Sequence, residues 1–218
     1  THNLCTVTLL GNLVGKPEIR YQVNPVIAIA ELTLATHTRW LDKATSQYKE
    51  WTSYHTVKVI GDIVEQALIH ASKGDVVLVH GYLLDSKKTS RAIIHATFAQ
   101  AFPKGYAQSI NQVQCSGELT APVKLLKTEQ NKDMAEINIT ISHKVISPVT
   151  QNINTFSIER AIHVWGKQAV YLSEHAETGD QIVVEGKLSY VAHNKQQFID
   201  SKQVVLLKSE KKNNPAAV

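Results

Sequence analysis

The sequence repeats one plan 105 residues further along the chain. Three glycines of the first half each have a counterpart at that offset: Gly61, Gly74 and Gly81 recur as Gly166, Gly179 and Gly186. The apolar positions of Val57–Leu83 also match those of Ile162–Leu188. A constant offset of this kind is the signature of an internal duplication. The 218 residues therefore make two small units that share one fold.

The composition is that of a globular protein, with 43% hydrophobic and 19% charged residues. No apolar run reaches the roughly 18–20 residues that a membrane span needs, and we recognise no signal peptide. Cys5 and Cys115 have neither redox nor zinc-site spacing, so we expect free thiols in a reducing cytoplasm, no metal site and no cofactor. The net charge of +4 is weak evidence for a polyanionic partner.

Alternation of apolar and polar residues predicts that the first half is mostly strands. We expect strands at 5–10, 28–36, 51–60, 76–84 and 92–98, with an extended piece at 14–21 and a polar hairpin loop at 41–50. Asp62 begins the helix, where its side chain and Glu65 fit a capping box. Gly74 ends it.

The second half repeats this order, with strands at 113–119, 123–128, 136–142, 156–165, 181–190 and 197–207 and a helix at 167–176. Three strands, a helix and two strands in about 100 residues is the order of the OB-fold, a five-stranded barrel. We therefore predict an all-β protein with one short helix per domain, built as two tandem OB-folds. The domains are 1–101 and 112–207, with a linker at 102–111 and a mobile tail at 208–218.

The first half also resembles bacterial single-stranded DNA-binding proteins over about residues 5–98. The matching segments follow in order: Leu10-Gly11-Asn12-Leu13-Val14, Pro17-Glu18-Ile19-Arg20-Tyr21, Leu32-Thr33-Leu34-Ala35-Thr36 with Trp40, Asp42-Lys43-Ala44-Thr45, Tyr54-His55-Thr56-Val57, Lys73-Gly74-Asp75-Val76 and Val79-His80-Gly81. The second half is more distantly similar, through Gly117, Trp165-Gly166, Thr178-Gly179-Asp180 and Val184-Glu185-Gly186. The resemblance implies binding of single-stranded DNA with little sequence preference. It also implies assemblies of four OB-folds, which a homodimer of this chain would supply.

Proteins hold single strands by stacking bases on aromatic rings and by placing cations along the phosphates. The first half offers rings and cations around its polar hairpin: Trp40, Trp51, Tyr54 and Tyr48, with Arg39, Lys43 and Lys49. The alternative for Trp51 and Tyr54 is packing in the core or at a subunit contact. Further candidate cations are Lys16, Arg20, Lys58, Lys87, Lys88 and Arg91, for which the alternative is a solvated surface.

The second half carries a different set of candidates: Trp165, Phe156, Arg160 and Lys187. Trp165 takes the position of Ile60, whereas Val145 takes that of Trp40. The hairpin at 146–155 has no charged residue. We therefore expect two unequal DNA-binding surfaces, with the first half dominant.

These observations favour a non-catalytic protein that protects single-stranded DNA during replication, recombination or repair. The ten histidines come with no nucleophile elbow, carboxylate pair or phosphate-binding loop, so we expect no enzyme. Alternatively, the second half is a docking or oligomerisation module of a replication-restart or conjugation complex, and RNA binding is a third option. Members of the resembled family usually end in an acidic tip. The ending at 211–218 lacks one, which puts recruitment of other proteins through such a tip in doubt.

Overall fold

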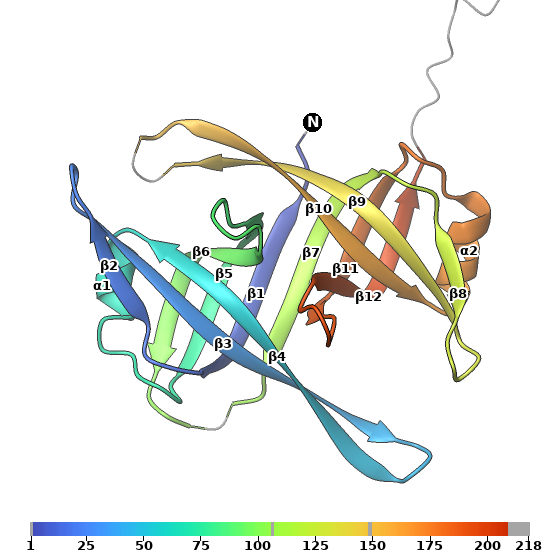
Figure 1. Cartoon of the computed structure of the whole chain (residues 1–218), viewed down its shortest axis with the longest axis horizontal. Helices are drawn as coiled ribbons and strands as arrows, with labels where there is room; N and C mark the ends of the chain where they lie inside the picture. Colours follow the sequence, from blue (N-terminus) through green and yellow to red (C-terminus); the bar gives the residue numbers. More distant parts are fainter. Residues whose placement is uncertain (1, 106, 148–149, 209–218) are drawn as a thin grey trace, which may run out of the picture.

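We describe a computed structural model, which covers residues 2–105, 107–147 and 150–208. The tail predicted at 208–218 therefore lies outside the described residues except for Lys208. Within the described chain most residues are in strands, with one helix in each half (Figure 1). These helices are α1 (Asp62–Ala67) and α2 (Lys167–His175).

The first half closes into a five-stranded barrel. Its strands are β1 (Cys5–Leu13), β3 (Ile27–Asp42), β4 (Gln47–Ile60), β5 (Val76–Asp85) and β6 (Ala92–Phe102). β1 pairs with β3 and β5, β4 pairs with β3 and β6, and β5 pairs with β6, so the pairings form a ring. The short β2 (Glu18–Gln22) pairs with β3 outside this ring.

The second half repeats this ring. Its strands are β7 (Ile110–Leu119), β8 (Lys124–Lys127), β9 (Asp133–Ile146), β10 (Ile153–Trp165), β11 (Gln181–Tyr190) and β12 (Gln197–Leu207). Their pairings repeat those of the first half, including the parallel pair β10–β12. The predicted fold class, two tandem OB-folds with one short helix each, is confirmed. Ile137, Ile139 and Ile141 point into the core as predicted.

Three local predictions are wrong. Helix α1 ends at Ala67, with Leu68 at its C-cap, rather than at Gly74. Asp62 does not cap α1, because Gly61 occupies the cap position with φ of 100° and no side-chain hydrogen bond caps the helix. The polar segment at 41–50 is also not simply a loop, since β3 continues to Asp42 and β4 begins at Gln47. Cross-strand contacts such as the 2.7 Å ion pair from Lys49 to Asp42 support this hairpin. Consecutive residues at the outer ends of β3 and β4 are exposed, so water reaches both faces.

The repeated Gly81 and Gly186 each mark a place where two strands approach too closely for a side chain. Both lie at an irregularity in the pairing of the last two strands of their barrel. A Cβ added to Gly81 would lie 1.9 Å from the carbonyl oxygen of His95, and one on Gly186 would lie 2.3 Å from that of Asp200. This close approach explains why both halves carry glycine at these positions.

The two barrels join through antiparallel pairing of β1 with β7, which makes the sheet continuous across the halves. Cys5 lies opposite Cys115 in this pairing, and both are buried free thiols. Burial raises the pKa of both thiols. The junction is therefore part of the hydrophobic core rather than a flexible hinge.

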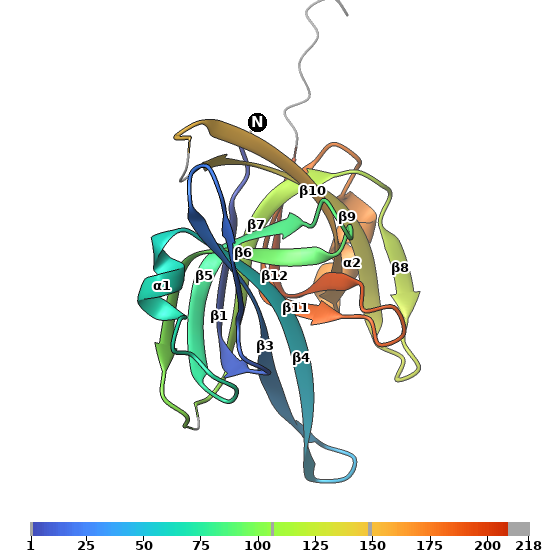
Figure 2. The same ribbon diagram turned by 60° about the vertical axis from the view of Figure 1, so that its left-hand side comes forward.

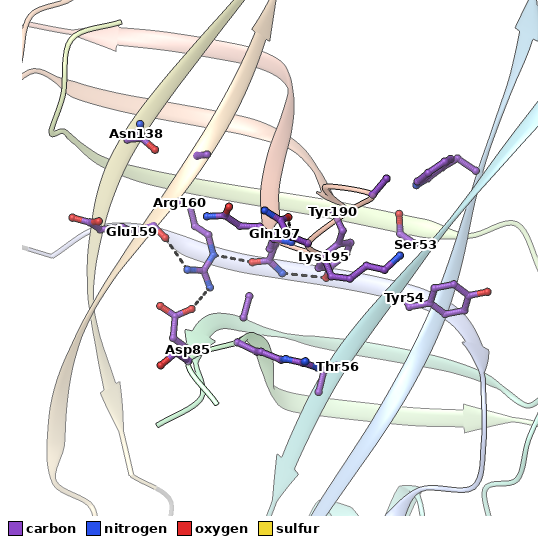
Figure 3. A pocket seen from close by; sticks show the side chains of 18 of the residues that line it. Ser53, Tyr54, Thr56, Asp85, Asn138, Glu159, Arg160, Tyr190, Lys195 and Gln197 are labelled. Atoms are coloured by element: carbon purple, nitrogen blue, oxygen red, sulfur yellow. Dashed lines mark hydrogen bonds and ion pairs between the residues drawn. The ribbon is translucent and has the colours of Figure 1, made fainter. Parts of the chain in front are cut away.

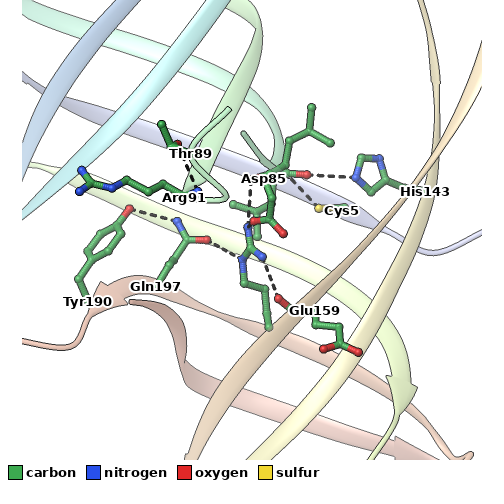
Figure 4. A network of polar contacts seen from close by, with 11 residues as sticks. Cys5, Asp85, Thr89, Arg91, His143, Glu159, Tyr190 and Gln197 are labelled. Carbon is green, nitrogen blue, oxygen red and sulfur yellow. Dashed lines mark hydrogen bonds and ion pairs between the residues drawn. The ribbon is translucent and has the colours of Figure 1, made fainter. Parts of the chain in front are cut away.

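A buried polar network also links the halves (Figure 4). Arg160 is only 5% exposed. It forms a 2.8 Å ion pair with Asp85 of the first half, and its Nε donates a 2.8 Å hydrogen bond to Oε1 of Gln197. Gln197 reaches the Tyr190 hydroxyl, which contacts Nδ1 of His55 at 2.9 Å. At the offset of 105, Arg160 corresponds to His55 and Tyr190 to Asp85. The network thus consists of two equivalent contacts, one charged and one neutral.

This network corrects the prediction that Arg160 contacts DNA. Its guanidinium also donates to the carbonyl oxygens of Glu159 and Leu84, at 2.8 and 3.1 Å. A buried charge needs such partners to offset its lost hydration. Arg160 therefore holds the halves together and is removed from the set of phosphate contacts.

We expect a lower pH to reduce the free energy of unfolding, because His55 is buried in its neutral form. Burial lowers the pKa of His55 to about 4, and its partner Tyr190 stays neutral because burial raises its pKa to about 12. The unfolded chain takes up a proton below about pH 6.5, so this contribution to stability is present above pH 6.5 and is lost as the pH falls toward 4. The expected loss from His55 at pH 5 is about 2 kcal/mol.

Urea unfolding at pH 7 and pH 5 checks this expectation. In His55→Gln the difference between the two pH values should shrink by about 2 kcal/mol relative to the wild type. An unchanged difference would contradict the role given to His55.

Candidate nucleic-acid interface

The β3–β4 hairpin extends well beyond the first barrel, and we call its outer part, Thr36–Ser53, the arm. Figure 1 shows the arm running past the second half, whereas the β9–β10 hairpin extends in the opposite direction over the first half. Figure 2 shows the arm standing clear of the first barrel. The arm is positioned by the long register of β3 with β4.

One face of the arm carries two tryptophans. Trp51 lies directly opposite Thr38, and Trp40 follows two residues later on the same face. Trp40 is 44% exposed and Trp51 48% exposed. Trp51 is therefore not a core residue, and both rings are available on one surface.

A groove runs between this face and the second barrel, and we call it the arm groove. It consists of three adjoining hollows of about 820, 550 and 830 Å³. Trp51 and Tyr190 line both the first and the second hollow, and Trp40 and Asp200 line both the second and the third. The groove thus leads from the contact between the halves, shown in Figure 3, to the β8–β9 turn.

The second barrel supplies the opposite wall of the arm groove. Trp165, 40% exposed, donates from Nε1 to Oδ1 of Asp200 at 2.8 Å, which fixes the orientation of its indole ring. The rings of His163 and Phe198 stack with centroids 4.1 Å apart and line the second hollow. Sequence reasoning missed Phe198, because its place in an alternating strand looks like that of a packing residue.

The model of the single-strand binding protein family matches residues 4–92 and 110–211. The chain belongs to the single-strand binding protein family. A solved deletion variant of the single-stranded DNA-binding protein from Thermus aquaticus is 24% identical, with a TM-score of 0.75 over 98% of both chains. The wild-type protein from that organism is 23% identical, with a TM-score of 0.75, over 96% of this chain and 95% of its own. At these identities the likeness shows the same fold.

For this member of the single-strand binding protein family, the predicted arm residues divide between two faces. Arg39 and Tyr48 lie on the face opposite the tryptophans, with the guanidinium carbon of Arg39 4.5 Å from the centre of the Tyr48 ring. Tyr54 is 59% exposed and lines only the first hollow. Lys49 shares the tryptophan face but is paired with Asp42.

The other predicted residues fall at several places in this family member. Arg91 lines the first hollow and Lys187 the second. The remaining predicted residues do not line any of the three hollows: Lys16, Arg20, Lys43, Lys58, Lys87, Lys88 and Phe156. Phe156 instead contacts His143, whose Nε2 lies 3.1 Å from the Leu83 carbonyl oxygen of the first half.

The charges that line the arm groove are nearly balanced. The unburied cations are Arg91, Lys132, Lys187 and Lys195, and the anions are Asp85, Glu129, Glu159 and Asp200. A neutral groove with several exposed rings is suited to stacking flat groups more than to concentrating phosphates. The described residues include no cluster of histidine, cysteine or acidic side chains that could hold a metal ion. No described helix is both long and apolar enough to cross a membrane.

Proposed function

We propose that the chain binds single-stranded DNA, largely without sequence preference, in the arm groove. The observation that carries this proposal is that Trp40, Trp51 and Trp165, from two halves, line one continuous groove. Only an unpaired strand exposes base faces to such rings, and every base has a face that can stack. The protein would protect single strands during replication, recombination or repair, without catalysis.

The arm groove changes the expectation of two unequal surfaces. The tryptophans of the first half do not face a surface of their own barrel alone, since the second barrel supplies the opposite wall. We infer that one strand contacts both halves along the groove. The first half still contributes two of the three tryptophans, so it supplies most of the stacking.

The homodimer is also part of this proposal. Five exposed apolar side chains lie on three inner strands of the sheet, β6, β7 and β12: Phe98, Phe102, Ile110, Val205 and Leu207. These strands belong to the sheet that runs across both halves. A second copy covering this face would bury the apolar side chains and bring four OB-folds together.

The uncharged hairpin of the second half supports a different role for that segment. Ile146 and Ile153 pair across the hairpin and are 61% and 66% exposed. Exposed apolar side chains of this kind are suited to contact with another protein rather than with phosphates. Ile146→Ser/Ile153→Ser is therefore expected to leave DNA affinity unchanged.

Titration with oligothymidine tests the function. The three tryptophans make intrinsic fluorescence a direct readout, and we expect it to be quenched on binding. Four groove cations allow a slope of log affinity against log salt near −3, at about −0.7 for each phosphate contact. A duplex of equal length is the control and should bind far more weakly. Equal binding of the duplex, or no quenching at low salt, would contradict the proposal.

A further inference from the structure

The third hollow of the arm groove has a tryptophan from each half in its walls. Trp40 comes from the arm of the first barrel and Trp165 from the end of β10 in the second. Both rings are about 40% exposed, at 44% and 40%. Among the described residues no ring contact joins the two, so both keep a surface open to the hollow.

This hollow has room for a nucleobase, and its lining can bond one. Its volume of about 830 Å³ lies within the range of small-molecule sites, which is about 300–1,000 Å³. The remaining lining residues are all polar: Thr128, Glu129, Gln130, Lys132, Asp200 and Ser201. Side chains of this kind can bond the edge of a base while the indoles cover its faces.

The duplicated positions show that this pair of rings occurs once in the chain. At the offset of 105, Trp40 corresponds to Val145 and Trp165 corresponds to Ile60. Neither aliphatic counterpart can stack a base. The aromatics are therefore not divided between two sites. They are concentrated where the arm of one half meets the barrel of the other.

We propose that Trp40 and Trp165 stack on the two faces of the same unpaired nucleobase, so that the two halves form one base clamp. The proposal rests on the proposed function, since it requires a single strand in the arm groove. The ring of Trp165 is held by its hydrogen bond to Asp200, and the ring of Trp40 is carried by the hydrogen-bonded arm. One wall of the clamp is therefore the Trp165 ring on the second barrel, and the other is the Trp40 ring on the arm.

A double-mutant cycle on the full chain tests the clamp. Trp40→Ala and Trp165→Ala should each weaken binding of a dye-labelled oligothymidine by about tenfold. If both rings hold one base, either single substitution already releases that base. The second substitution then lowers the affinity only a little further. The double variant should therefore lose about 20-fold, well short of the roughly 100-fold that independent rings would give.

The control cycle pairs Trp165→Ala with Tyr54→Ala, because Tyr54 lines only the first hollow. These two effects should multiply. All variants should keep the wild-type unfolding midpoint and the wild-type salt slope, because no phosphate contact is removed. Multiplicative losses for Trp40 and Trp165 would overturn the clamp while leaving the proposed function intact. A wild-type protein that binds no oligothymidine would instead overturn the proposed function itself.

Discussion

Gly81→Ala is expected to lower the free energy of unfolding by about 3 kcal/mol. The added methyl group would lie 1.9 Å from the His95 carbonyl oxygen and 2.8 Å from the Ala96 Cα atom. Both are backbone atoms of β6, so neither can move aside without shifting the strand. β5 and β6 would have to separate where their pairing is already irregular. Urea unfolding of the full chain measures the loss.

Gly15→Ala is the matched control for Gly81→Ala. No atom lies within 4 Å of the Cβ position at Gly15, and its φ is not in the left-handed region. Its effect should stay within about 0.5 kcal/mol. Gly186→Ala repeats the test in the second half, where the nearest backbone oxygen is 2.3 Å away. A loss below 1 kcal/mol at both Gly81 and Gly186 would mean that the strands separate easily there.

The glycines also show why the fold could be predicted from the sequence. Each barrel needs glycine at the same crossing of strands, so the duplication preserves both the residue and its spacing. Alternation located the core for a similar reason, because a half-buried strand must place every second side chain inward. Val57 and Val59 are fully buried, as their alternation predicts. These signals are local, and they do not depend on how the two halves meet.

The arm could not be predicted in the same way. Beyond the barrel both faces of β3 and β4 meet water, so no alternation marks them as strands. The sequence therefore indicated the rings of Trp40 and Trp51 but not their place against the second barrel. The prediction that Arg160 contacts phosphate did not hold for a related reason. A lone cation on a strand resembles a phosphate contact until Asp85 and Gln197, which are distant in the chain, are seen to surround it.

Removing both arm tryptophans is expected to weaken binding of oligothymidine by about 2.5 kcal/mol, or about 70-fold. Each stacked base contributes about 1–3 kcal/mol, and the two rings share the second hollow, so their effects are not fully additive. The variant is Trp40→Ala/Trp51→Ala. Anisotropy of a dye-labelled oligonucleotide is the readout, because this variant retains only one tryptophan.

The matched control removes two aromatic rings that are equally exposed but lie outside the arm groove. Tyr21 and Tyr171 are 51% and 52% exposed, on β2 and α2. Tyr21→Ala/Tyr171→Ala should change the affinity less than twofold. If both double variants lose affinity equally, the arm groove is not where the strand lies. If the arm variant alone loses affinity and keeps its salt slope, the arm tryptophans bind bases while the cations that bind phosphate remain in place.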